Sequence, residues 1–229
     1  MSAKTHADVS RAAVLVGPER LELAEFPLPE VGDDDGLLRV EATGICGSDY
    51  AQFKGRLSAF EAPMPIIPGH EVVGHVHELG PSAAQRWRVR PGDLVVVDEV
   101  LRCLRCRACA RGERGCAAMR LYGLTITTTE MPSLWGGYAE YMYLHANTVL
   151  HRVPKGMSAD EAAAFVPIAN GIRWMSHLGA VGVGDTVVIE GPGQHCLGCV
   201  IGAREAGART VIVTGTAADA DRLAVARRR

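Results

Sequence analysis

Two glycine-rich stretches of this sequence carry the side chains best suited to binding a catalytic metal. Residues 44–49 read GICGSD and supply Cys46, while residues 69–71 read GHE and supply His70 and Glu71. A thiol, an imidazole and a carboxylate are groups that zinc binds, and the glycines allow the sharp turns that bring such groups together. The two stretches therefore predict a zinc site with one coordination position open for substrate.

Four further cysteines crowd into the short segment 98–120: Cys103, Cys106, Cys109 and Cys116. This segment is rich in arginine and glycine and poor in apolar side chains, so hydrophobic burial alone would not fold it. A tetrahedral zinc held by four thiolates would supply its order. The alternative is disulfide pairing under oxidation, which a reducing cytosol opposes.

A third candidate site is the turn at residues 191–196, which reads GPGQHC. It lies between an apolar run at 186–189 and a predicted helix that ends near residue 206, and a second strand is predicted at 210–213. This β-α-β order with a glycine-rich first turn is typical of dinucleotide binding, although Cys196 replaces the third glycine. The predicted cofactor-binding residues are Gly191, Gly193, Gln194, His195, Thr214 and Gly215.

The choice between NAD and NADP stays open at this stage. No acidic residue directly follows the second strand, where the sequence reads Thr214-Gly215-Thr216. Asp219 and Asp221 come later and are expected on the next helix. An acid at the strand end would have indicated NAD, because it binds the ribose hydroxyls.

The elements that must position these groups are mostly short strands. Apolar or alternating runs at 11–16, 21–26, 37–42, 72–79 and 94–97 are separated by glycine and proline, and 135–141 resumes strand character, which predicts an irregular β-barrel. The strand at 37–42 runs directly into the turn that holds Cys46. Ser158 and Glu161 have the spacing of a helix capping box. We expect a β-rich domain at 1–157 and an α/β domain at 158–229.

The composition excludes several classes of function. The chain has 229 residues, of which 48% are hydrophobic and 22% charged, with a formal net charge of -2. This charge gives no electrostatic reason to expect nucleic acid or a membrane surface as partner. No apolar run approaches the roughly 20 residues of a membrane span. We expect a cytoplasmic protein with a small-molecule partner.

In their order along the chain, these stretches and the segment GGYAE at 136–140 resemble the zinc-dependent medium-chain alcohol dehydrogenase family, from about residue 11 to the end. The resemblance implies a GroES-like barrel joined to a Rossmann domain, which is a doubly wound parallel sheet. It further implies a homo-oligomer, dimer or tetramer, that transfers a hydride between an alcohol or polyol and NAD(P).

The resemblance also implies roles for individual residues. Cys46 and His70 match the catalytic zinc ligands, and Glu71 matches a carboxylate that exchanges on and off the metal. Asp49 matches the group that holds the His70 ring, and Ser48 matches the hydroxyl that relays the substrate proton.

Two positions depart from the family pattern. Tyr50 and Ala51 stand where many relatives carry a relay histidine. In the stretch that usually supplies a third ligand, residues 165–171, only Asn170 offers a candidate, and it is a poor zinc ligand. Glu71 or water would have to complete the coordination, so we expect weaker zinc binding here than at the four cysteines.

The α/β segment is short for a complete nucleotide-binding domain. A Rossmann sheet has about six strands, and residues 158–229 contain two predicted strands. We therefore expect an incomplete Rossmann domain, in a fragment of a longer protein or in a truncated product. The rival interpretation is a catalytically inactive zinc-binding GroES-like module that serves in folding or interaction.

Overall fold

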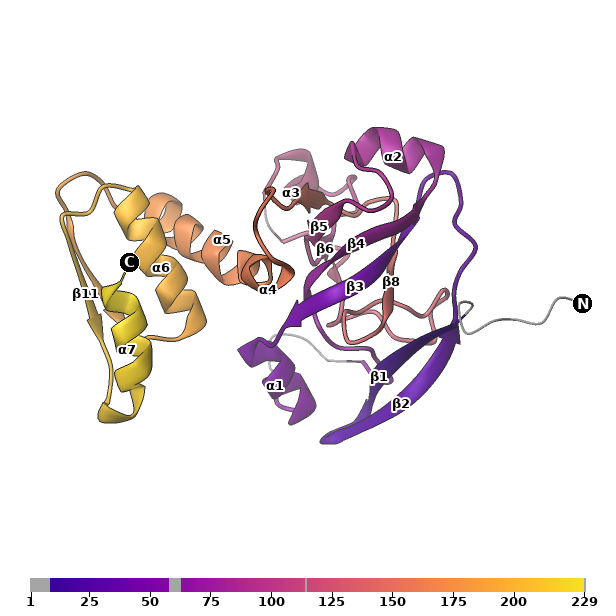
Figure 1. Cartoon of the computed structure of the whole chain (residues 1–229), viewed down its shortest axis with the longest axis horizontal. Helices are drawn as coiled ribbons and strands as arrows, with labels where there is room; N and C mark the ends of the chain where they lie inside the picture. The colour runs from indigo at the N-terminus through magenta and orange to yellow at the C-terminus, as the bar shows by residue number, and fades with distance from the viewer. Residues whose placement is uncertain (1–8, 58–62, 114, 229) are drawn as a thin grey trace, which may run out of the picture. The chain divides into compact units, whose positions relative to one another are not determined.

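The computed structural model describes residues 9–57, 63–113 and 115–228. The chain divides into two compact units, residues 1–163 and 164–229, and each is described by itself. The first unit consists mainly of strands, and the second consists of helices packed on a pair of strands (Figure 1). In the described part of the chain, every helix is too short or too polar to cross a membrane.

A five-stranded antiparallel sheet forms the centre of the first unit, in the order β8-β3-β4-β5-β9. Its longest strands, β3 (Gly36–Gly44) and β4 (Glu71–Leu79), pair along their whole length, from Gly36 opposite Leu79 to Gly44 opposite Glu71. The end of β3 therefore lies beside the start of β4, and this register brings residues 44–49 next to residues 69–71. The remaining strands are β5 (Leu94–Val97), β8 (Tyr141–Leu144) and β9 (Leu150–Arg152).

Two smaller strand pairs complete the β-rich unit. β1 (Val9–Gly17) and β2 (Arg20–Pro27) form an antiparallel hairpin. β6 (Val100–Leu101) and β7 (Arg120–Leu121) pair with each other at the two ends of the cysteine-rich segment, which contains the one-turn helix α3 (Arg107–Ala110). The strands expected at 11–16, 21–26, 37–42, 72–79 and 94–97 are confirmed.

A cluster of buried apolar side chains packs on the central sheet. Leu38, Val76, Val95, Met142 and Leu144 form its centre, and all are almost completely inaccessible to solvent. Each such side chain contributes about 1.5–3 kcal/mol through its removal from water. This core fixes β3 and β4, and through them the segments that follow and precede these strands.

The strand expected over 135–141 is present only from Tyr141 onward. A β-carbon built on Gly136 would lie 1.9 Å from the Ile67 carbonyl oxygen, and one built on Gly137 would lie 2.4 Å from the Val72 side chain. These glycines thus let the backbone pass close to neighbouring segments in a loop, rather than pair in the sheet.

Two helices of the first unit, α1 (Gly47–Phe53) and α2 (Pro81–Trp87), were not expected from the sequence. The capping box of Ser158 and Glu161 is confirmed, with the Ser158 hydroxyl accepting from the Glu161 amide at 3.2 Å. It begins a single turn, α4 (Ala159–Ala162), which contacts β3 and β4.

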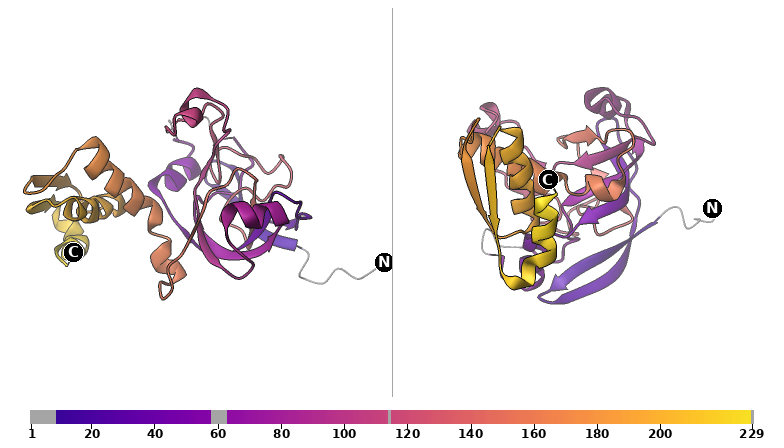
Figure 2. Two further views of the ribbon diagram at one scale, coloured as in Figure 1. Left: turned by 90° about the horizontal axis from the view of Figure 1, so that it is seen from above. Right: turned by 60° about the vertical axis from the view of Figure 1, so that its left-hand side comes forward.

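The second unit contains a parallel pair of strands with a helix between them in sequence. β10 (Thr186–Glu190) and β11 (Thr210–Thr214) pair in parallel, and α6 (Gln194–Glu205) packs along them through Cys199 and Val200 (Figure 2). The other elements are α5 (Phe165–Arg173), a π-helical turn (Trp174–Leu178), a 3-10 turn (Ala217–Asp219) and α7 (Ala220–Arg227). The β-α-β order expected over residues 186–213 is present.

Candidate functional site

Cys46, His70 and Glu71 converge where the end of β3 meets the start of β4. One ligand atom from each lies within 4.8 Å of the other two. His70 and Glu71 are buried, with exposed fractions of 5% and 1%, whereas Cys46 is partly accessible. The arrangement offers a sulfur, an imidazole nitrogen and a carboxylate oxygen around one point, which is a suitable donor set for zinc.

The Glu71 carboxylate occupies space that is free only because residue 44 is a glycine. A β-carbon on Gly44 would lie 2.2 Å from Glu71 Oε2. The other oxygen, Oε1, is buried and has no hydrogen-bond partner among the described residues. Burial raises the pKa of Glu71. A buried acceptor without a partner costs free energy, and a cation at this point would satisfy it, so these residues fit a metal ion.

Asp49 lies behind the His70 ring. Its Oδ1 is 3.3 Å from His70 Nδ1, without the alignment of a good hydrogen bond, and its Oδ2 accepts from the Cys46 amide at 2.8 Å. Burial acts to lower the pKa of His70, but Asp49 and Cys46 outweigh it and raise this pKa to about 10. Because Nδ1 faces Asp49, Nε2 is the atom available to a metal.

Ser48 and Cys46 both interact with the His70 side chain. The Ser48 hydroxyl oxygen is 3.3 Å from His70 Nε2. A hydrogen bond with His70 lowers the pKa of Cys46, against the opposing effect of burial. The sulfur is thereby favoured in its thiolate form, which is the form that binds metals.

Two further polar residues, partly buried Tyr138 and buried Gln52, were not predicted from the sequence. Tyr138 packs its ring against Gly69, where a β-carbon would lie 2.5 Å from the ring, and burial and then the charge of Asp49 raise its pKa. Gln52 on α1 is fully buried and donates to the Leu124 carbonyl at 3.4 Å. Tyr138 belongs to the GGYAE motif, which could have singled it out, whereas no sequence signal indicates Gln52.

The segment 98–120 is here called the cysteine lobe. Its four cysteines form a second group suited to binding a metal. Their sulfurs lie within 4.8 Å of one another, and all are free thiols. Backbone amides of Ala117 and Cys109 lower the pKa of Cys106 to about 6, and the Cys103 amide donates to Cys116 Sγ at 3.3 Å. Amide donors of this kind stabilise metal-binding thiolates.

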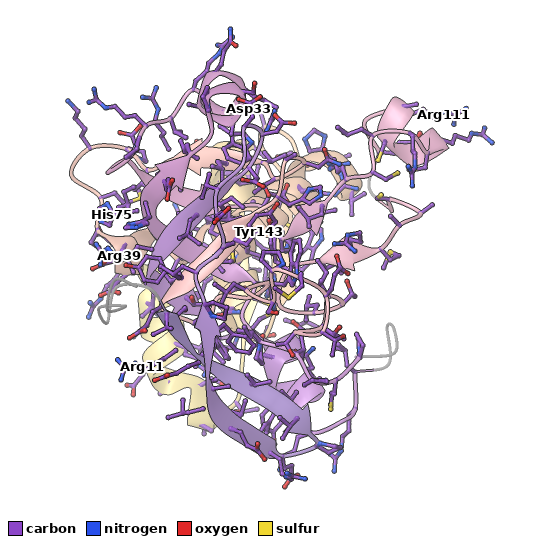
Figure 3. All side chains as sticks on the ribbon, turned by 90° about the vertical axis from the view of Figure 1, so that its right-hand side faces the viewer. Arg11, Asp33, Arg39, His75, Arg111 and Tyr143 are labelled. Carbon is purple, nitrogen blue, oxygen red and sulfur yellow. The ribbon has the colours of Figure 1, made fainter. Side chains whose placement is uncertain are left out.

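Among the described residues of the cysteine lobe, few apolar side chains are buried. Leu101 at its start is buried in the core of the sheet, whereas Leu104 and Met119 are 66% and 45% exposed, and Arg111 points away from the sheet (Figure 3). These exposed side chains agree with the expectation that hydrophobic burial alone would not fold this segment. The geometry fits a four-thiolate zinc that would order it.

The predicted cofactor-binding residues lie at one end of the β10–β11 pair. Gly191 has a φ of +82°, and its amide donates to the Thr214 carbonyl at 3.0 Å, which ties the turn to the end of β11. Gly193 is the N-cap of α6, and a β-carbon built on it would meet no atom within 4 Å. The first turn of α6, which contains Gln194 and His195, thus opens toward free space, as binding of an anion requires.

Asn170 lies on α5 in the second unit, beside the start of α6. Its side-chain nitrogen lies 3.3 Å from His195 Nε2, and Trp174 stacks on the His195 ring with centroids 5.3 Å apart. These three residues join α5 and the π-helical turn to the start of α6. Within the first unit, Glu71 is the candidate for the third ligand beside Cys46 and His70.

Comparisons with known proteins agree on one relationship. The sequence profile of the family described as "Alcohol dehydrogenase GroES-like domain" matches residues 32–155. A Mycobacterium tuberculosis protein named "Probable alcohol dehydrogenase adh" is 44% identical over 223 residues, which cover 95% of this chain and 60% of that protein. The erythritol/L-threitol dehydrogenase of Mycolicibacterium smegmatis is 34% identical over 93% of this chain and 59% of its own length.

A solved structure shows the same similarity in three dimensions. An alcohol dehydrogenase from Thermotoga maritima superimposes with a TM-score of 0.83 at 28% identity, covering 96% of this chain and 60% of that one. The chain thus spans about 60% of the length of the relatives that it matches.

Proposed function

Because the chain belongs to the zinc-type medium-chain alcohol dehydrogenase family and contains its GroES-like domain, we propose that it serves in hydride transfer between an alcohol or polyol and NAD(P). The supporting observation is the group of Cys46, His70 and Glu71, which places three different zinc-binding atoms within 4.8 Å. Activity, substrate and partners of the whole protein are part of this proposal, since the relatives are longer.

The residues around this group have distinct roles in the proposed reaction. A zinc ion held by Cys46, His70 and Glu71 would lower the pKa of an alcohol at the open position. Ser48, 3.3 Å from His70 Nε2, is placed to take up the proton of that alcohol. Asp49 would orient the His70 ring through its Nδ1 side and keep Nε2 directed at the metal.

The cofactor would bind at the turn before α6. The parallel β10–β11 pair with α6 between supports the proposal that residues 158–229 are part of a Rossmann domain, preceded by a GroES-like domain at 1–157. Gly191 and Gly193 would let the pyrophosphate approach the backbone, with Gln194 and His195 in the first turn of α6. Thr214 and Gly215 would lie beside the ribose, and both NAD and NADP are candidates.

The proposal is tested by measuring zinc per chain together with binding of NADH and of NADPH to the purified protein. We expect two zinc ions and fluorescence-detected binding of at least one nucleotide. Gly193→Ala should abolish nucleotide binding and leave both zinc ions in place, because its methyl group would occupy the open space at the turn without touching the protein. Gly17→Ala is the matched control, since its β-carbon also meets no atom within 4 Å.

The same experiment distinguishes hydride transfer from the rival function, that of a catalytically inactive zinc-binding module. Two zinc ions without binding of either nucleotide would contradict hydride transfer by this chain and support a zinc-binding GroES-like module. Nucleotide binding that Gly193→Ala leaves unchanged would contradict the proposed position of the cofactor.

A further inference from the structure

Two of the seven cysteines belong to neither metal-type group. Cys46 and the four cysteines of the lobe lie in those groups, which leaves Cys196 and Cys199, both on α6. Cys196 is partly accessible, and Cys199 is buried with an exposed fraction of 5%. They lie three residues apart and belong to the same apolar cluster under the β10–β11 pair.

The Cys196 thiol links the start of α6 to the end of β10 across the glycine-rich turn. Its sulfur donates to the carbonyl oxygen of Glu190, the last residue of β10, at 3.4 Å. This contact spans the turn formed by residues 191–193. A change at the Cys196 sulfur therefore acts directly on the turn.

Cys199 is within reach of Cys196 for a disulfide, but only if the helix adjusts. Ideal helix geometry puts Cα atoms three residues apart at about 5 Å, within the range that disulfides span. The Cβ atoms, however, are about 5–6 Å apart in a regular helix, and a disulfide needs roughly 3.5–4.5 Å. Burial, and then the charge of the neighbouring Cys196, raise the pKa of Cys199.

The packing of α5 determines which part of α6 can adjust. A β-carbon on Gly198 would lie 2.2 Å from the Pro167 carbonyl oxygen, and one on Gly202 would lie 2.8 Å from the Gly171 carbonyl oxygen. From Gly198 onward, α6 is therefore held against the backbone of α5. The displacement needed for a disulfide falls on the first turn of α6 and on the glycine-rich turn.

We propose that Cys196 and Cys199 form a reversible thiol–disulfide site, in which oxidation by a small-molecule disulfide distorts the turn at residues 191–193 and weakens dinucleotide binding. The effect on the nucleotide rests on the proposed function. The disulfide itself does not depend on it.

The chemistry is two successive thiol–disulfide exchanges. The Cys196 thiolate, having lost its proton to solvent, attacks a disulfide RSSR, forms a mixed disulfide and releases one thiolate RS⁻. The Cys199 thiolate then attacks the Cys196 sulfur, forms the internal disulfide and releases the second RS⁻. Two protein thiols are oxidised, one RSSR is reduced to two RSH after protonation, and the hydrogen bond to Glu190 is lost.

The first test locates the bond. Zinc-loaded protein is incubated with oxidised glutathione, and its peptides are mapped by mass spectrometry without reduction. We expect a Cys196–Cys199 linkage that dithiothreitol reverses, and a glutathione adduct on Cys196 that accumulates in Cys199→Ala. The site is disproved if both residues remain thiols, or if the wild-type protein retains the adduct without forming the internal bond.

The second test measures the consequence. The Kd for NADH or NADPH is compared before and after oxidation, and we expect an increase of about tenfold that dithiothreitol reverses. In Cys196→Gly, which restores the third glycine of the fingerprint, oxidation should leave the Kd of that variant unchanged. A disulfide that forms without changing the Kd would overturn the coupling. Failure of the reduced protein to bind either nucleotide would instead refute the proposed function and with it the coupling, while the mapping still decides the disulfide.

Discussion

The cysteine lobe and the group of Cys46, His70 and Glu71 present zinc ligands in opposite ways. The cysteine lobe draws all its ligands from one short segment, residues 103–116, in which the large apolar side chain of Leu104 is exposed. The other group draws its ligands from two segments that the β3–β4 register brings together, and the sheet core supports both.

This difference shows which site depends on its metal for structure. In the cysteine lobe, zinc would supply the order that hydrophobic burial does not. At the other site the sheet has already placed the ligands, so metal binding there would serve chemistry and contribute little to the fold. Removal of zinc from the cysteine lobe should therefore change the structure more than removal of zinc from the group of Cys46, His70 and Glu71.

The largest effect is expected from a ligand in the cysteine lobe. Cys116→Ser should abolish zinc binding there and expose the arginines of residues 102–111 to trypsin, because the local order is lost. Zinc content and the rate of limited proteolysis check this. Cys196→Ala, which removes a thiol outside both groups, should retain two zinc ions. If the cysteine lobe of Cys116→Ser protein lost its zinc but were cut by trypsin no faster than that of the wild type, zinc would not be what orders the lobe.

A steric change at the other site should affect metal binding without affecting the cysteine lobe. In Gly44→Ala the new methyl group would overlap with Glu71 Oε2, so we expect zinc affinity at Cys46 and His70 to fall by about 100-fold. Gly47→Ala is the matched control, since its β-carbon meets no atom within 4 Å. Competition with a chromophoric chelator measures both variants. Equal affinities in the two variants would show that Glu71 does not contribute to the site.

The sequence predicted those features that rest on local pattern. Alternation of apolar residues indicated β4, a continuous apolar run indicated β5, and the cysteine spacing indicated the lobe. The glycines at 191 and 193 indicated the turn before α6. Each of these signals lies within a few neighbouring residues, so no knowledge of the fold was needed to read it.

Features that depend on close approach of distant segments could not be read in this way. The helix α1 was missed because Gly47-Ser48-Asp49 resembles a turn, whereas the Asp49 carboxylate caps the helix by accepting from the Cys46 amide. The contact of Tyr138 with Gly69 joins residues far apart in the sequence. The loop at Gly136 and Gly137 likewise follows from tertiary packing, which overrides the strand propensity of its neighbours.

A smaller effect is expected from the carboxylate behind the ligand. Asp49→Asn should lower zinc affinity at His70 by about tenfold, because the neutral amide orients the imidazole less strongly. Chelator competition measures this zinc affinity, and the affinity of the cysteine lobe for zinc serves as the internal reference. Loss of zinc from both groups would show that Asp49 supports the whole fold rather than this site.

The smallest effect is expected from an ion pair at the base of the cysteine lobe. Arg120 lowers the pKa of Glu130, and the two side chains are about 35% and 45% exposed. The pair should stabilise the fold above the ordinary glutamate pKa of 4.5, and this contribution is lost as the pH falls through the lowered pKa. Glu130→Gln should cost less than about 1 kcal/mol at pH 7, with no difference in strong acid. Denaturant unfolding at pH 7 and in strong acid measures the free energy of unfolding. A larger loss of this free energy at pH 7 would mean that the ion pair, and not zinc alone, orders the cysteine lobe.

The most direct test of the two-site comparison is stepwise removal of zinc by a chelator from the purified protein. We expect two separate steps, in which the first zinc leaves from Cys46 and His70 with the fold intact. The second should leave from the four cysteines at a higher chelator concentration and unfold the lobe, as followed by proteolysis. Simultaneous release of both zinc ions with the same affinity, or unfolding of the β-rich unit at the first step, would contradict it.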